Sequence, residues 1–397
     1  MTEPEVARRL RLLHRGFFLS GIATVLLGPL IPPLRTLWQV SNDEMAWLFP
    51  AQFLSAALGS VLSTRDFRRS LFVGYLSLAL GLLGLAFLVW PWALGAMVLL
   101  GLGLGLILPA TNLLVAHVQP SDRSRAVAKA NLIWGLGAAS SPMFLALAVD
   151  GLLKEYLALL AAGSLVVGAH LASAFDRRTF DRIRENEPGP AGDVGAPSTG
   201  RDSWFSLPHL ILAAMFFLYI GVENSIGGWL IDLSEQVGQM GLWAMLVGSG
   251  FWASVLVGRA LLATGWFRDL SEFSLYTGAL ALAATGLALL LFGRAAPALA
   301  LGALLSGFGL APLFPLSVSF LAELMARDGS RDTGWIFALG SCGGAVLPWL
   351  TGRVDGGSEM LRFGFVVPLV GLVGLATLLT AFRRLTEESR QPTKIAP

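Results

Sequence analysis

Charged side chains are scarce in this chain. Only 14% of its 397 residues are Asp, Glu, Lys or Arg, while 55% are hydrophobic. An average soluble domain has about 25% charged residues, and a chain of this length would need polar surface for two or three such domains. The shortage excludes a soluble enzyme and a disordered protein, and the formal net charge of +2 excludes a nucleic-acid partner. We expect a polytopic membrane protein whose surroundings are the lipid bilayer.

Cysteine and histidine are also rare. The single cysteine, Cys342, excludes intrachain disulfides and thiolate metal clusters. His117 and His170 have no partner at the spacing of metal ligands. The apolar segments contain no nucleophile, base or metal-ligand set either. We therefore expect no enzyme activity, no metal and no cofactor.

Long apolar segments dominate the chain. A membrane-spanning helix needs ~20 mostly apolar residues. Twelve segments satisfy this requirement, which predicts an all-α polytopic membrane protein with 12 transmembrane helices. They lie at roughly 16–36, 44–63, 70–90, 93–118, 126–149, 153–175, 207–231, 240–265, 270–293, 296–325, 331–352 and 360–382.

The basic residues between these segments are unevenly distributed. Of the 28 Lys and Arg, 23 fall on the side of the membrane that carries both termini. The other side has only Arg35, Lys154, Arg294, Arg353 and Arg362. Because basic residues favour the cytoplasmic side, we expect both termini in the cytoplasm and a multi-pass protein of the cytoplasmic (inner) membrane of a prokaryote.

One polar segment divides the chain. Residues 176–206 begin with charged residues and end in Pro, Gly and Ser, which is typical of a flexible linker. Six apolar segments precede it and six follow. We predict an N-terminal six-helix half (1–175), a cytoplasmic linker (176–206) and a C-terminal six-helix half (207–397).

The two halves share an internal repeat. Five glycines and prolines of the first half recur 206 residues later, namely Gly101 and Gly307, Gly103 and Gly309, Pro109 and Pro315, Gly137 and Gly343, and Pro142 and Pro348. Single matches of this kind arise by chance. Five at one offset indicate a duplicated six-helix unit.

These features resemble the major facilitator superfamily. The segments GIATVLLGPLIPPL, GSVLSTRDFRR and GLAPLFP look like its first span, the loop after its second span and its tenth span. FFLYIGVENSIGGWL and FWASVLVGR resemble the fucose permease-like sugar transporters within it. The resemblance implies two parallel six-helix halves with a substrate site between them near the midplane. It also implies transport by rocking of the halves around that site.

The loop after the second span departs from the superfamily pattern. Six residues separate Gly59 from Asp66, and Phe67 stands where the family has a basic residue, but Asp66, Arg68 and Arg69 are present. The resemblance implies a cytoplasmic gate in which the acid caps a helix and pairs with Arg. Ordinary anchoring by basic residues at the membrane surface is the alternative.

Glu223 is the acidic residue that lies well inside an apolar segment. A charged residue there costs ~2.5–3.5 kcal/mol even on the lenient insertion scale, and about 24 Å of helix separates Glu223 from Leu207 at ~1.5 Å per residue. That distance predicts a site beyond the midplane toward the outside. Gly221, Gly227 and Gly228 would let the helix distort or unwind around it.

Three roles are open for Glu223. An isolated carboxylate could bind and release a proton, which is the chemistry of a proton-coupled symporter. It could instead bind the solute through a hydrogen bond, or have a structural role. Fucose permease-type symporters carry acids in the first and fourth spans, and this chain has none in either. A uniporter or a different coupling ion is therefore also possible.

Amides and aromatic side chains in the spans form a candidate solute site. Sugars need donor–acceptor groups around their hydroxyls and a flat apolar surface under the ring. The candidates that meet these needs are Gln52, Asn112, Asn131, Trp134, Tyr219, Glu223, Asn224, Trp252 and Trp335. Hydrogen bonding between helices is the alternative role of the amides, and a place in the interfacial belt is that of the tryptophans.

Arg259 lies near the predicted cytoplasmic end of the eighth span. Its long side chain could reach the interface, pair with an acid such as Glu323, or act in a gate together with Asp66, Arg68 and Arg69. The overall prediction is a monomeric secondary transporter for a small polar solute, a monosaccharide first of all, driven by a proton or another ion. An exporter of amphipathic compounds and a membrane sensor without turnover are the alternatives.

Overall fold

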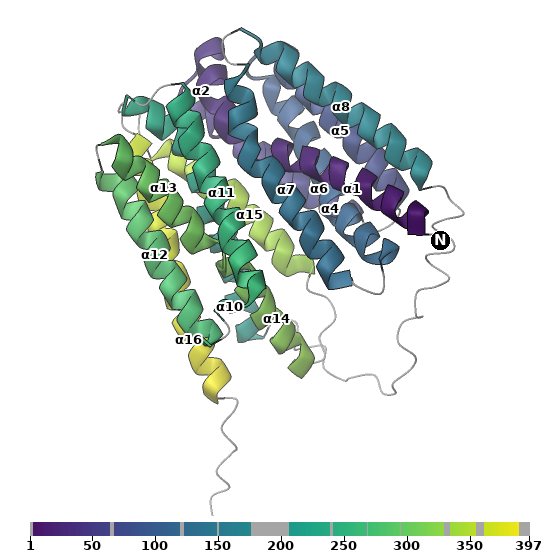
Figure 1. Ribbon diagram of the computed structural model, residues 1–397. Helices are drawn as coiled ribbons and strands as arrows, with labels where there is room; N and C mark the ends of the chain where they lie inside the picture. Colours follow the sequence, from purple (N-terminus) through teal and green to yellow (C-terminus); the bar gives the residue numbers. More distant parts are fainter. Residues whose placement is uncertain are drawn as a thin grey trace, which may run out of the picture.

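The computed structural model describes residues 3–63, 67–119, 123–148, 151–175, 206–238, 241–267, 269–293, 295–328, 334–354 and 361–388. All secondary structure in these ranges is helical. The helices run side by side in one bundle (Figure 1). The predicted all-α polytopic fold is confirmed.

Among its described residues, the first half has eight helices. In order they are α1 (Glu3–Val25), α2 (Leu27–Trp38), α3 (Asn42–Met45), α4 (Leu48–Leu62), α5 (Phe67–Phe87), α6 (Ala93–Val118), α7 (Arg123–Ala146) and α8 (Leu153–Ala174). The described part of the second half contains α10 (Leu207–Gln236), α11 (Leu242–Thr264), α12 (Glu272–Phe292), α13 (Ala296–Leu310), α14 (Leu313–Asp328), α15 (Gly334–Arg353), the 3₁₀-helix η3 (Leu361–Phe365) and α16 (Val366–Glu388).

The helices can be compared one by one with the twelve predicted spans. Among the described residues, 10 helical stretches are long and apolar enough to cross a membrane, and the bent pair α1–α2 makes 11. Helix α7, which corresponds to the predicted span at 126–149, does not meet this test. It has 24 residues and packs inside the bundle, but its first turns carry Arg123, Arg125 and Lys129, which makes it less apolar.

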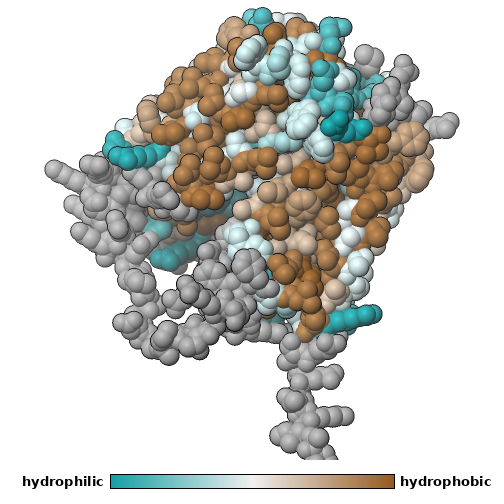
Figure 2. All heavy atoms as spheres, turned by 180° about the vertical axis from the view of Figure 1, so that it is seen from behind, coloured by the Kyte–Doolittle hydropathy of each residue, from teal (hydrophilic) through white to brown (hydrophobic). Residues whose placement is uncertain are grey.

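The outer surface is apolar. Leu147, Leu159, Trp266 and Phe292 are among the large hydrophobic side chains that are more than two-thirds exposed. Figure 2 shows hydrophobic residues over most of the visible flank and hydrophilic residues toward the two ends. A soluble monomer rarely exposes continuous apolar area of this extent. The flank is therefore the surface that faces lipid.

A sharp bend separates α1 from α2. The two helices meet at an angle of 49° beside Leu26. Pro29 has no N–H to donate to the carbonyl of Val25, and its ring crowds that turn, so proline accounts for the bend. Pro32 and Pro33 follow within α2. The bend places Thr24 at the end of α1, where its backbone carbonyl is available to a neighbouring helix.

The internal repeat is visible in the packing. A Cβ on Gly137 would collide with the carbonyl oxygen of Phe18, and one on Gly343 would collide with that of Phe217. Residues 18 and 217 are 199 apart, while residues 137 and 343 are 206 apart. Equivalent glycines of the two halves thus contact equivalent neighbours, with the offset changed by loop length.

The bundle has two distinct ends. We call the linker end the one at which α1 begins, α8 ends, α10 begins and α16 ends, and the far end the other one (Figure 1). The two halves meet mainly through the helix pairs α7 with α11, α4 with α15 and α2 with α10, and α15 also contacts α3.

Candidate functional site

A cavity of about 410 Å³ lies between the two halves. Its walls are residues 128–138 of α7, residues 252–263 of α11, and Phe314 and Pro315 at the start of α14. Because α7 begins and α11 ends at the linker end, the cavity extends from the middle of the bundle toward that end. This volume lies in the range of small-molecule sites, ~300–1,000 Å³.

Glu223, Tyr219 and Arg259 form a polar triad beside this cavity. The Tyr219 hydroxyl donates to Glu223 Oε1 over 2.5 Å. Arg259 Nη2 donates to the same oxygen over 2.9 Å and to the Tyr219 hydroxyl over 2.9 Å. Glu223 is buried, whereas the Arg259 side chain is 30% exposed and lines the cavity. Arg259 therefore lies between the buried Glu223 carboxylate and the cavity.

The triad corrects two expectations about these residues. Glu223 is not an isolated carboxylate, because Arg259 neutralises it. Arg259 is turned toward the protein interior and not toward the interface, and its partner lies 36 residues away on another helix, which no local spacing indicates. Buried ion pairs are stable only when further hydrogen bonds compensate their desolvation, and Tyr219 provides one. Tyr219 and Glu223 share a helix face, as their i, i+4 spacing predicts.

Helix α10 is longer and more regular than expected. It runs without a break from Leu207 to Gln236, five residues beyond the predicted end at 231. Glu223 consequently lies near the middle of the helix, with 16 residues before it and 13 after it. The expected unwinding at Gly227 and Gly228 does not occur. Because these glycines have no side chain, the rings of Trp252 and Phe49 pack directly against the α10 backbone.

A second polar cluster lies in the first half. Gln52 Nε2 donates to the Thr24 carbonyl over 3.1 Å, and Trp134 Nε1 lies 3.4 Å from Thr24 Oγ1. The structure thus brings together two predicted site residues around Thr24, which sequence reasoning missed. Thr24 precedes Glu223 by 199 residues, the same offset that relates Phe18 to Phe217. The repeat could therefore have identified it as the counterpart of Glu223.

The amides Asn112 and Asn131 are bonded to each other. Asn131 Nδ2 donates to Asn112 Oδ1 over 2.9 Å, which joins α7 to α6. Only Asn131 lines the cavity. Both amides therefore form a hydrogen bond between helices, which was the alternative to solute binding. A solute in the cavity could reach only Asn131 directly.

The remaining candidates are dispersed. Trp252 lines the cavity, but Asn224 and Trp335 do not: Asn224 bonds to the Ile220 carbonyl of its own helix, and Trp335 is the second residue of α15, near the linker end. Arg68 and Arg69 lie exposed in the first turn of α5, and Arg68 Nε donates to the Ala172 carbonyl over 3.3 Å. Asp66 lies outside the described residues.

An ion pair joins the two halves at the far end. Arg35 Nη1 of α2 lies 2.6 Å from Asp232 Oδ1 of α10, and the Asp232 side chain is 0% exposed. Asn42 Oδ1 accepts from the same nitrogen over 2.6 Å, and Gln236 Nε2 donates to Asp232 Oδ2 over 3.2 Å. Glu223 is thus not the only acid within a span. Asp232 escaped the prediction because the span was expected to end at residue 231.

A second ion pair reinforces this end. Arg353 Nε of α15 lies 2.8 Å from Asp43 Oδ1 of α3, and its guanidinium covers the Trp349 ring, with 5.0 Å from Cζ to the ring centroid. Trp349 meets Trp47 edge to face at 5.3 Å between centroids. Both ion pairs connect the first half to the second, so the far end is closed where the cavity ends.

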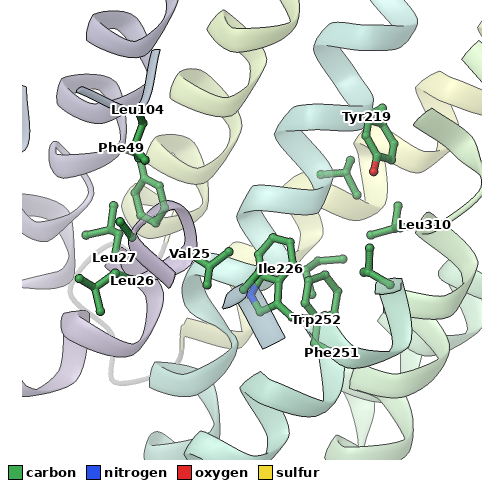
Figure 3. Packing of buried hydrophobic residues seen from close by; sticks show 14 of the residues in the cluster. Val25, Leu26, Leu27, Phe49, Leu104, Tyr219, Ile226, Phe251, Trp252 and Leu310 are labelled. Carbon is green, nitrogen blue, oxygen red and sulfur yellow. The ribbon is translucent and has the colours of Figure 1, made fainter. Parts of the chain in front are cut away.

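Apolar packing seals the level between the ion pairs and the cavity. Figure 3 shows buried apolar side chains of both halves, with Val25 on one side and Ile226 and Trp252 on the other. A Cβ on Gly28 would collide with the carbonyl oxygen of Gly227, so the backbones of α2 and α10 are in contact there. Such close approach requires a residue without a side chain at position 28.

Comparison with known proteins places this arrangement in a family. The sequence profile of the Major Facilitator Superfamily matches residues 15–348. The glucose/mannose transporter GlcP of Bacillus subtilis (strain 168) is 24% identical over 378 residues, which are 91% of this chain and 92% of GlcP.

Solved structures share the fold. A bacterial homologue of the human lysosomal transporter Spinster, in an inward-facing and unoccupied conformation, superposes with a TM-score of 0.74 at 12% identity and covers 99% of this chain and 100% of its own. A D-xylose–proton symporter gives a TM-score of 0.71 at 15% identity, with 93% and 95% covered. At these identities the likeness concerns the fold alone.

Proposed function

Because the chain belongs to the Major Facilitator Superfamily, we propose that this transporter carries a monosaccharide across the cytoplasmic membrane of a prokaryote, and that a proton bound at Glu223 drives uptake. The observation that carries the proposal is the Glu223–Arg259–Tyr219 triad beside the cavity between the halves. The solute and the coupling ion are the parts that need testing.

The chemistry of the cavity suits a small polyol. Trp134, Trp252 and Phe314 offer flat apolar surfaces for a sugar ring, and Asn131 offers an amide for its hydroxyls. Gln52, Asn112 and Tyr219 lie behind this wall and hold Thr24, Asn131 and Arg259 in position. The names of the relatives, a glucose/mannose transporter and a D-xylose–proton symporter, point to the same class of solute.

The two halves would move relative to each other around this cavity. We assign the linker end to the cytoplasm because most basic residues lie there. The structure then corresponds to the inward-facing state, with the cavity toward the cytoplasm and the far end closed by the Arg35–Asp232 and Arg353–Asp43 ion pairs. Uptake requires a second state in which these ion pairs separate.

Glu223 can couple proton binding to this movement. When Glu223 is ionised, it holds Arg259 against α10 through Oε1. A proton on the carboxylate removes the charge that attracts the guanidinium, and Arg259 is then free to reorient toward the cavity. Proton binding thereby changes the charge and shape of the solute site.

The substitution Glu223→Gln tests the coupling. In proteoliposomes, the variant should exchange labelled sugar across the membrane but should no longer accumulate it in response to a pH gradient. Glu155→Gln, which removes an exposed carboxylate from the first turn of α8, is the matched control and should accumulate sugar normally. Gradient-driven accumulation by Glu223→Gln at the wild-type level would refute the coupling role.

Export of amphipathic compounds is a second candidate, and one observation favours it. Most of the cavity wall is apolar, including Leu132, Val255, Leu256 and Leu262. Expression in a drug-sensitive bacterial host separates the two proposals. Resistance to amphipathic compounds without any sugar uptake would support the exporter.

A further inference from the structure

Arg259 has hydrogen-bond donors that the protein does not use. Both of its hydrogen bonds, to Tyr219 and to Glu223, leave from Nη2. Nε is buried and has no acceptor among the described residues, and no bond from Nη1 to any of them is formed either. A guanidinium has five N–H donors, and a donor without an acceptor favours the binding of one. Nε is enclosed by the protein, so an acceptor from outside would bind at Nη1.

The position of Arg259 defines where that acceptor comes from. Its side chain is 30% exposed and lines the cavity. It carries the only charge among the described lining residues. A solute in the cavity, stacked on Trp252 of the same helix, would place its oxygen atoms within reach of the guanidinium.

Glu223 determines the charge that this solute meets. With Glu223 ionised, the Glu223–Arg259 pair has no net charge. A solute carboxylate bound to Arg259 in the cavity would then lie close to the negative charge of Glu223. Repulsion from Glu223 then offsets part of the attraction to Arg259, and the cost of taking the solute carboxylate out of water is not compensated. Without the charge on Glu223, the guanidinium becomes an unneutralised cation, which carboxylates match in geometry and charge.

We propose that Arg259 donates directly to oxygen atoms of the transported solute, and that Glu223, as long as it is ionised and neutralises Arg259, makes the cavity favour uncharged sugars over sugar acids. This inference rests on the proposed sugar site. It assigns Arg259 to solute recognition, and it gives Glu223 a role in selectivity that is independent of any proton gradient.

Equilibrium binding to purified full-length protein tests the proposal. D-Glucose and D-glucuronate differ only in the carboxylate at C6, and their affinities can be measured by tryptophan fluorescence or calorimetry without a membrane. We expect wild type and the control Glu155→Gln to bind glucose at least tenfold more tightly than glucuronate. Glu223→Gln should increase the affinity for glucuronate by a larger factor than the wild-type preference for glucose, so that the preference is reversed.

The substitution Arg259→Lys tests the contact itself. It keeps a positive charge next to Glu223, so the buried carboxylate retains a partner, but it removes Nε and Nη1. We expect at least tenfold weaker glucose binding at an unchanged melting temperature. The double substitution Glu223→Gln/Arg259→Gln removes both charges. Because it lacks the guanidinium, it should not show the preference for glucuronate over glucose that we expect of Glu223→Gln.

Two outcomes would overturn the inference while the transport proposal stands. One is a wild-type preference for glucose over glucuronate in Glu223→Gln, together with loss of proton-driven uptake. The other is wild-type glucose affinity in Arg259→Lys. If wild type binds none of a panel of neutral hexoses, the sugar function itself fails, and this inference fails with it.

Discussion

Breaking the Arg35–Asp232 ion pair should open the far end of the transporter. Asp232→Asn keeps the size of the side chain and its bond with Gln236, but it removes the charge that attracts Arg35 across 2.6 Å. The pair spans the two halves and exists only when they are in contact at this end. Its loss therefore destabilises the closed far end relative to the open one.

The expected magnitude follows from burial. Removing one partner of a fully buried ion pair costs about 3–5 kcal/mol. Asp232 is fully buried, but Arg35 is 24% exposed and keeps its bond to Asn42, so water and the amide compensate part of the loss. We expect a shift of about 2 kcal/mol, which increases the ratio of open to closed molecules roughly 30-fold at 1.4 kcal/mol per factor of ten.

Double electron–electron resonance, which measures the distance between two spin labels, can detect this shift from closed to open molecules. Spin labels at Leu37→Cys on α2 and Leu242→Cys at the start of α11 report on exposed positions of the two halves at the far end. The labels are introduced with Cys342→Ser, which removes the single native cysteine. Asp232→Asn should transfer population from the short to the long distance.

The neighbouring ion pair provides the matched control. Asp43 and Arg353 are about half exposed, and exposed pairs contribute about 0–1 kcal/mol. Asp43→Asn should therefore change the distances little. If Asp232→Asn and wild type gave identical distance distributions, or if Asp232→Asn and Asp43→Asn shifted them equally, the reasoning would be refuted. The Arg35–Asp232 pair would then not be the main interaction that keeps the far end closed.

Two further predictions concern packing and solute stacking. Gly343→Ala should lower the melting temperature by several degrees, because a Cβ there meets the Phe217 carbonyl and overpacking costs about 1–3 kcal/mol. The control Gly278→Ala, with no atom within 4 Å of the added Cβ, should leave the melting temperature unchanged or raise it slightly. Trp252→Ala should weaken sugar binding about tenfold through the loss of a stacking surface, and the control Trp92→Ala, at an exposed ring far from the cavity, should bind sugar as wild type does.

Composition was sufficient to predict the class of fold. A chain with 14% charge and twelve apolar segments has few alternatives to a helical bundle in a membrane, because each buried backbone group must be satisfied within its own helix. The repeat of glycines and prolines and the family resemblance read from short motifs led to the same conclusion. The profile match confirms the family.

The candidate site could be predicted only in part. Glu223 was found because a carboxylate in hydrocarbon is rare, and Tyr219 was found because it shares a helix face with Glu223. Asp232 was missed through an error of a few residues in the end of one helix. Thr24 was missed because a single hydroxyl in an apolar segment carries no signal of its own.

The sequence by itself determined that this protein spans a membrane, that its chain is duplicated, and that its charges lie mainly at helix ends. These properties depend on composition and spacing, which act along the chain. Only the tertiary structure decided that Glu223 meets Arg259 and that Arg35 meets Asp232. Ion pairs between distant helices depend on how the helices pack and rotate against each other, and residues 36 or 197 positions apart leave no periodic trace of their contact.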